Sequence, residues 1–139
     1  MNVVDAQTLQ CVLDGRPKPA EIADEQDLAG LLHAKGHGHG MYRPQHVDTA
    51  VSNLHRLHAV AGLCRDLEAT QAEPILLPGA SLLRLYPDLG CRPMEDVDLL
   101  VRPGHRQLVV DALDRRGWHA SERHPNVFSH ADGSVIDLH

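Results

Sequence analysis

The stretch CRPMEDVDLLV, residues Cys91 to Val101, decides how the second half of the chain is interpreted. Acidic side chains stand directly before and within an apolar run that is typical of a buried strand. Residues i and i+2 of a strand point to the same side, so we expect Asp96 and Asp98 to present their carboxylates together. Two like charges this close repel each other, and a divalent cation would remove that conflict. Taken alone, the pair also fits two surface acids at the mouth of a strand.

The composition limits the classes of protein to which the chain can belong. Its 139 residues suffice for one domain with a hydrophobic core. The formal net charge of -6 provides no overall basic field that would attract nucleic acid. The cysteines Cys11, Cys64 and Cys91 are far apart and form no CxxC pattern, so neither a disulfide framework nor a zinc knuckle is expected. No signal peptide or membrane span is recognisable, and we expect a cytoplasmic protein.

Before residue 72 the apolar residues recur at the spacing of helices. We expect two short helices over residues 6–13 and 19–34, followed by a long helix over residues 45–71. We expect one face of the long helix to meet the core and Asn53 to lie off that face. The apolar stripe consists of Val47, Val51, Leu54, Leu57, Ala61, Cys64 and Leu67.

The segment KGHGHGMYRP, residues 35–44, is rich in glycine and histidine. We interpret it as a flexible polar connector, because histidines separated by glycines are not a preorganised metal site. A histidine-rich metal-handling protein remains an alternative. It would use His33, His37, His39 and His46.

After residue 72 the pattern changes to short strands and helices, which predicts an α+β fold with a small mixed sheet. Strands are expected over residues 73–77, 96–102, 118–123, 126–130 and 134–139, and helices over residues 81–90 and 104–118. In the second of these helices the inward residues would be Leu108, Val109, Ala112 and Leu113. Asp132-Gly133 is a typical hairpin turn. We therefore expect a helical region over residues 1–71 and an α/β core over residues 72–139.

Two further features of this half suggest chemistry. In LLPGASLL, residues 76–83, a strand enters a glycine turn and Ser81 opens a helix. Such a turn offers N–H groups and a hydroxyl to a phosphate, although Ser81 also fits an ordinary N-cap. Asp137 lies in the late apolar strand SVIDLH. A third carboxylate beside the pair would complete a two-metal site and help to activate a hydroxyl.

The order of these motifs resembles the nucleotidyltransferase superfamily that includes DNA polymerase beta. More narrowly, it resembles a bacterial nucleotidyltransferase family with the pattern LLKGA…LYP…R.M.DVDLLV…G…DLH. The matching text is LLPGASLLRLYPDLGCRPMEDVDLLV (residues 76–101), RRGW (residues 115–118) and VIDLH (residues 135–139).

The resemblance implies a role for each matching residue. Asp96, Asp98 and Asp137 match the carboxylates that bind Mg²⁺ (or Mn²⁺) and carry catalysis. Gly79 and Ser81 match the turn that holds nucleotide phosphates, and Arg92 matches an arginine that steers phosphate or pairs with a carboxylate. The implied reaction is transfer of a nucleoside monophosphate from a nucleoside triphosphate to a hydroxyl of an unknown acceptor.

Two departures from the pattern favour an alternative. Pro78 stands where the narrower family usually has lysine, so a cation and an N–H donor are lost beside the turn. Relatives usually continue beyond the residue matching Asp137 into a C-terminal helical region, and a partner chain that completes this side is one of the explanations left open. The alternative is a catalytically inactive module of the same fold that binds a nucleotide or a partner.

Overall fold

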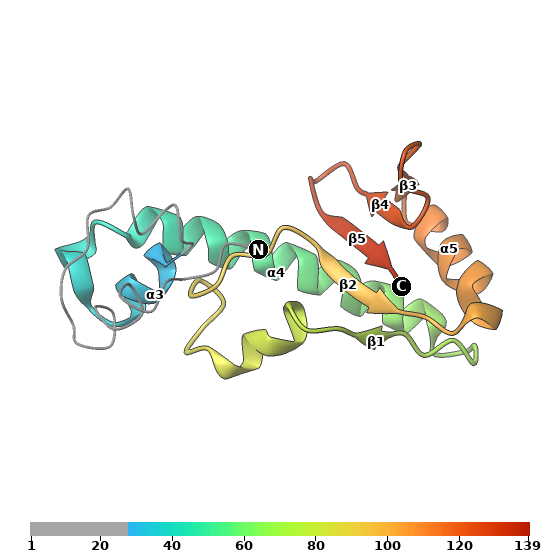
Figure 1. Ribbon diagram of the computed structural model, residues 1–139, viewed down its shortest axis with the longest axis horizontal. Coiled ribbons are helices and arrows are strands. Elements are labelled where there is room, and N and C mark those ends of the chain that lie inside the picture. The colour runs from blue at the N-terminus through green and yellow to red at the C-terminus, as the bar shows by residue number, and fades with distance from the viewer. Residues whose placement is uncertain (1–27) are drawn as a thin grey trace. The chain divides into compact units, whose positions relative to one another are not determined.

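The computed structural model describes residues 28–139, and Figure 1 shows their helices and strands. The chain forms two compact units. Of the described residues, the first unit comprises residues 28–53 together with Leu83–Pro93, and the second comprises Leu54–Leu82 together with Met94–His139. The predicted helix over residues 6–13 and most of the one over residues 19–34 lie outside the described residues. The division of the chain at residue 72 stays a prediction.

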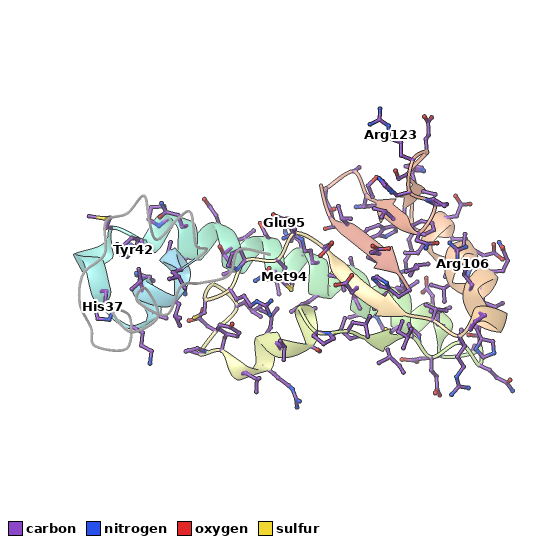
Figure 2. All side chains as sticks on the ribbon, viewed as in Figure 1. His37, Tyr42, Met94, Glu95, Arg106 and Arg123 are labelled. Carbon is purple, nitrogen blue, oxygen red and sulfur yellow. The ribbon has the colours of Figure 1, made fainter. Side chains whose placement is uncertain are left out.

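In the first unit, short helices precede the long helix α4 (Arg43–Leu67), whose later part belongs to the second unit. They are α3 (Ala29–Ala34) and the 3-10 helix η1 (His37–Gly40). The segment predicted to be a connector thus contains a helical turn. Gly38 makes that turn possible, because it has a φ of 73° and any β-carbon there would lie 2.7 Å from the ring of Tyr42. Tyr42, labelled in Figure 2, is buried with Leu28, Ala29 and Leu32.

The predicted core face of α4 is wrong over most of the helix. Val47, Val51 and Leu54 of the predicted stripe are 46%, 48% and 56% exposed. The fully or nearly fully buried residues are Asn53, Val60, Leu63 and Leu67. Only Leu67 belongs to both sets, so the buried face is rotated from the one that apolar spacing indicates.

A buried amide explains this difference. Asn53 is 0% exposed, and its Nδ2 donates hydrogen bonds to the carbonyl oxygens of Leu89, at 2.8 Å, and Arg92, at 2.7 Å. A buried polar group is tolerated where it finds such partners. These partners come from a distant part of the sequence, so the periodicity of the helix alone does not reveal them.

The second unit contains a five-stranded sheet in the order β1-β2-β5-β4-β3. The strands are β1 (Ile75–Leu76), β2 (Val97–Leu100), β3 (His119–Ala120), β4 (Val127–Ser129) and β5 (Val135–Leu138). β2 and β5 are parallel, whereas the other neighbours are antiparallel. The predicted α+β class with a mixed sheet is confirmed, and Figure 1 shows β5 between β2 and β4.

Each predicted strand exists but is shorter than expected, and the helices differ in type or length. The helix predicted over residues 81–90 is the 3-10 helix η2 (Ala80–Leu85). The last helix is α5 (Arg106–Arg115), preceded by the 3-10 helix η3 (Pro103–His105). The predicted hairpin turn is confirmed: Gly133 has a φ of 83°, and the N–H of His130 donates to the carbonyl of Ser134 at 3.0 Å.

The core of the second unit lies between one face of the sheet and the helices. Alternation along β2 and β5 buries every second residue, namely Val97, Leu99, Ile136 and Leu138. From α5, Val109, Ala112 and Leu113 join this core as predicted. Leu108 was also predicted to point inward, but it is 41% exposed. The alternation leaves the intervening residues of β2 and β5 on the opposite face.

Arginine side chains at the two ends of α5 bind the loop before β4 and the end of α4. Arg106, labelled in Figure 2, donates through Nη2 to Oδ1 of Asn126 at 2.7 Å and so holds the loop before β4. Arg116 makes two hydrogen bonds with Asp66 near the end of α4, at 2.6 and 2.8 Å. Paired bonds of this kind fix the geometry of both side chains. These contacts hold the helices around the core, which in turn supports the sheet.

Candidate functional site

Asp98 and Asp137 lie side by side on the face of the sheet opposite the core. Asp98 on β2 is the direct partner of Asp137 on β5 in the parallel register. Their side chains are 32% and 29% exposed. The buried alternate residues on both strands fix this register, because a slip by one residue would turn the acids into the core. The structure therefore brings together two carboxylates from segments far apart in the sequence.

His139 completes this group, although the sequence analysis did not identify it. Its Nε2 lies 2.9 Å from Oδ1 of Asp98 and 3.8 Å from Oδ2 of Asp137. The hydrogen bond to Asp98 raises the pKa of His139, and the nearby carboxylates add to this effect. One ligand atom from each of the three residues falls within 4.8 Å of the others. The available signal was the spacing DLH, which places His139 two residues after Asp137 on the same strand side.

Asp96 directly precedes β2 and is exposed. Its pKa is raised, first by partial desolvation and then by the negative charges of Asp98, Asp137 and Glu95. These charges make the ionised form of Asp96 less favourable, as expected where several carboxylates converge. Within residues 28–139, the group of close ligand atoms contains Asp98, Asp137 and His139 rather than Asp96. Asp96 thus belongs to the acidic surroundings of that group.

The glycine turn after β1 lies beside Asp98. The N–H of Leu77 donates to the carbonyl of Asp98 at 3.0 Å. Gly79 follows with a φ of 131°, and a β-carbon built there would lie 4.0 Å from Oδ2 of Asp98. Ser81 is half-buried within η2, and its N–H faces the carbonyl of Leu77 at 3.4 Å. The turn and the carboxylates therefore share one edge of the second unit.

Arg92 belongs to the first unit. There its carbonyl accepts a hydrogen bond from Asn53. Its predicted role with phosphate stays a prediction. Among the histidines of the alternative metal site, the rings of His33 and His46 are in contact, with centroids 4.7 Å apart, whereas His37 lies in η1.

Comparison with known proteins gives the family of the chain but no related structure. No helix within residues 28–139 is long and apolar enough to cross a membrane. No curated protein matches the chain, and neither does any solved structure. A family model described as uncharacterised nucleotidyltransferase matches residues 20–139, a range that contains the glycine turn and all the carboxylates described above. The chain therefore belongs to this nucleotidyltransferase family.

Proposed function

We propose that the protein is a metal-dependent nucleotidyltransferase. It transfers a nucleoside monophosphate from a nucleoside triphosphate to a hydroxyl of an acceptor. Membership of the nucleotidyltransferase family supports a nucleoside triphosphate as the donor. The observation that carries the proposal is the alignment of Asp98 with Asp137 on adjacent parallel strands, with the turn at Gly79 beside them.

The donor atoms of this site fit a hard divalent cation. Asp98 and Asp137 offer carboxylate oxygens from one sheet face, and Asp96 stands two residues before Asp98. Carboxylates are the ligands that Mg²⁺ and Mn²⁺ prefer, and an imidazole such as that of His139 is better tolerated by Mn²⁺. Partial desolvation, followed by the negative charges of its neighbours, raises the pKa of Asp96, and a cation bound beside them would favour its ionised form. Bound there, the cation would neutralise phosphate charge and stabilise in-line transfer.

The remaining groups would position the triphosphate. A phosphate beside several carboxylates is repelled unless a cation lies between them, so phosphate binding and metal binding should depend on each other. Gly79 has no side chain to obstruct a phosphate next to Asp98. The hydroxyl of Ser81, two residues further on, would donate a hydrogen bond to a phosphate oxygen. Asp137, on the neighbouring strand, would orient the acceptor hydroxyl.

One observation favours the alternative of a nucleotide-binding or partner-binding module without catalysis. Pro78 is exposed directly before Gly79, at the place where lysine stands in the pattern described above. The turn thus offers one N–H fewer and no cationic side chain. Such a module would bind nucleotide and metal at the same residues but would release no pyrophosphate.

Calorimetric titration with each of the four nucleoside triphosphates, in Mg²⁺ or Mn²⁺, tests the site. We expect saturable binding that requires the metal and is abolished in the double variant Asp96→Asn/Asp98→Asn. The matched control is Asp111→Asn, an exposed acid on α5 that contacts Gln107. Binding that persists in the double variant would refute the assignment of these carboxylates. Pyrophosphate release in the presence of candidate hydroxyl acceptors then separates the transferase from the inactive module.

A further inference from the structure

The first unit contains a second cluster of metal-binding side chains, formed by His46 on α4 and by Asp88 and Cys91 after η2. Nε2 of His46 lies 2.8 Å from Oδ1 of Asp88, and Sγ of Cys91 lies 3.6 Å from the same oxygen. One ligand atom from each residue falls within 4.8 Å of the other two. His46 lies about forty positions before the loop that carries Asp88 and Cys91, so the fold brings the three residues together.

Close backbone packing brings these segments together. A β-carbon on Gly90 would lie 2.5 Å from the carbonyl oxygen of His46 and 2.6 Å from its ring. A β-carbon on Gly30 of α3 would lie 1.7 Å from the carbonyl oxygen of Gly90. Real side chains do not tolerate such distances, so both positions require glycine. The loop that carries Asp88 and Cys91 can therefore lie directly against α3 and α4.

Hydrogen bonds and a ring contact from neighbouring residues fix the positions of these three side chains. The two hydrogen bonds from Asn53 to the carbonyls of Leu89 and Arg92 fix the loop on either side of Cys91. The N–H of Gly90 donates to Oδ1 of Asp88 at 2.8 Å. The ring of His33 packs against that of His46 at 56° and restricts its orientation. Supporting contacts of this kind are typical of metal centres, because they orient the residues that bind the ion.

We propose that His46, Asp88 and Cys91 bind one Zn²⁺ ion. A thiolate, an imidazole and a carboxylate together are ligands that zinc accepts, and magnesium does not use thiolates. Tetrahedral bonds of about 2.0–2.3 Å place ligand atoms about 3.3–3.7 Å apart. The distance of 3.6 Å between Cys91 and Asp88 already fits this spacing, and the distance between His46 and Asp88 would open by about 0.5 Å.

Burial indicates how the ion would be held. Cys91 is 2% exposed, and the side chain of His46 is 16% exposed, whereas that of Asp88 is 48% exposed. The site is thus covered on the side of the thiol and open on the side of the carboxylate. A water molecule would complete the coordination of the ion on the open side. The ion would cross-link the first turn of α4 to the loop at residues 88–91.

Cobalt titration of the protein, after removal of metals by a chelator, tests this proposal directly. We expect one equivalent of Co²⁺ to produce the charge-transfer absorption of a cobalt–thiolate bond, and Zn²⁺ to displace it. Cys91→Ala should abolish the absorption, and Cys64→Ala, which removes an exposed thiol of the second unit, should retain it. Asp98→Asn should also retain it, because this site does not use the carboxylates of the sheet.

A second variant keeps the test decisive if Cys91→Ala does not fold. His46→Gln leaves the thiol in place and should weaken Zn²⁺ binding at least about 100-fold, more than the loss of a supporting contact usually costs. Zinc should also raise the melting temperature of the unaltered protein and not that of this variant. The proposal is overturned if the folded protein shows no cobalt–thiolate absorption at one equivalent. An absorption that survives in folded Cys91→Ala, or an unchanged zinc affinity in His46→Gln, would equally overturn it.

Discussion

Asp98 and Asp137 are direct partners across the parallel strands β2 and β5, so their carboxylates project from one face of the sheet at the same level. Neighbouring like charges on a sheet destabilise it, whereas a shared cation makes the same arrangement favourable. Without a metal ion, the contacts of His139 with both carboxylates offset part of this repulsion, and a shared cation would offset more of it.

Asp137→Asn should raise the free energy of unfolding and weaken the binding of nucleotide. In chelator, we expect the free energy of unfolding by urea to rise by up to about 1 kcal/mol, because one of two adjacent negative charges is removed. Affinity for nucleoside triphosphate with Mn²⁺ should fall at least about 100-fold, since the proposed metal site would lose one of its carboxylates. Loss of stability in chelator together with unchanged nucleotide affinity would show that Asp137 is a structural residue.

Gly79→Ala should damage the turn beside Asp98. The φ of 131° at Gly79 is strained for any residue with a side chain, and such strain costs about 1–3 kcal/mol. Urea unfolding should report this cost, and calorimetry should report weaker nucleotide binding. Gly104→Ala is the matched control, because Gly104 has open space around it and no positive φ. Equal stability of the two variants would contradict the strained turn.

Asn53→Ala should destabilise the first unit. The carbonyls of Leu89 and Arg92 would lose their donor in a buried place, and each unsatisfied buried group costs about 1–3 kcal/mol. Ser52→Ala on the exposed side of α4 should be nearly neutral. Thermal and urea unfolding of both variants measure the difference. A loss below about 0.5 kcal/mol for Asn53→Ala would mean that water replaces the amide without cost.

The turn between β4 and β5 predicts a pH dependence of stability. Oδ1 of Asp132 accepts a hydrogen bond from the N–H of Ser134 at 2.8 Å and lies 3.0 Å from Nδ1 of His130. The bond from Ser134, followed by the contact with His130, lowers the pKa of Asp132 from 3.8 to about 2.

Because the pKa is lower in the folded state, the stabilisation is present above about pH 4 and is lost as the pH falls towards about 2. The carboxylate is 37% exposed, so screening should limit the effect to about 1 kcal/mol or less. The difference in unfolding free energy between the unaltered protein and Asp132→Asn should therefore shrink across this range. If the unfolding free energies of the two proteins change in parallel between pH 4 and pH 2, Asp132 does not contribute in this way.

The sheet and its acids were largely accessible from the sequence, because they follow local rules. Short apolar runs identified β2 and β5, and an acid within an apolar strand drew attention to Asp137. The hairpin turn at Asp132-Gly133 was equally local. These local runs do not reveal that β2 pairs with β5, which places Asp98 opposite Asp137 and His139 beside both.

The buried face of α4 was predicted wrongly for a physical reason. Apolar spacing treats Asn53 as an outward residue, yet hydrogen bonds to a remote loop bury it. The cluster of His46, Asp88 and Cys91 escaped notice for the same reason, because its members are near neighbours only after that loop has packed on α4. Interactions between distant segments, whether polar or metal-binding, leave little trace in a local pattern.

The central position of β5 in the sheet also affects how the chain folds during its synthesis on the ribosome. β5 is the last of the five strands to leave the ribosome, yet it lies at the centre, between β2 and β4. A nascent chain that has reached only Gly133 carries β2 and β4 without their common neighbour, so the edges of both strands that pair with β5 are still unpaired. The second unit should therefore fold late and in one step, so its yield in the cell should depend on protection of the growing chain by chaperones.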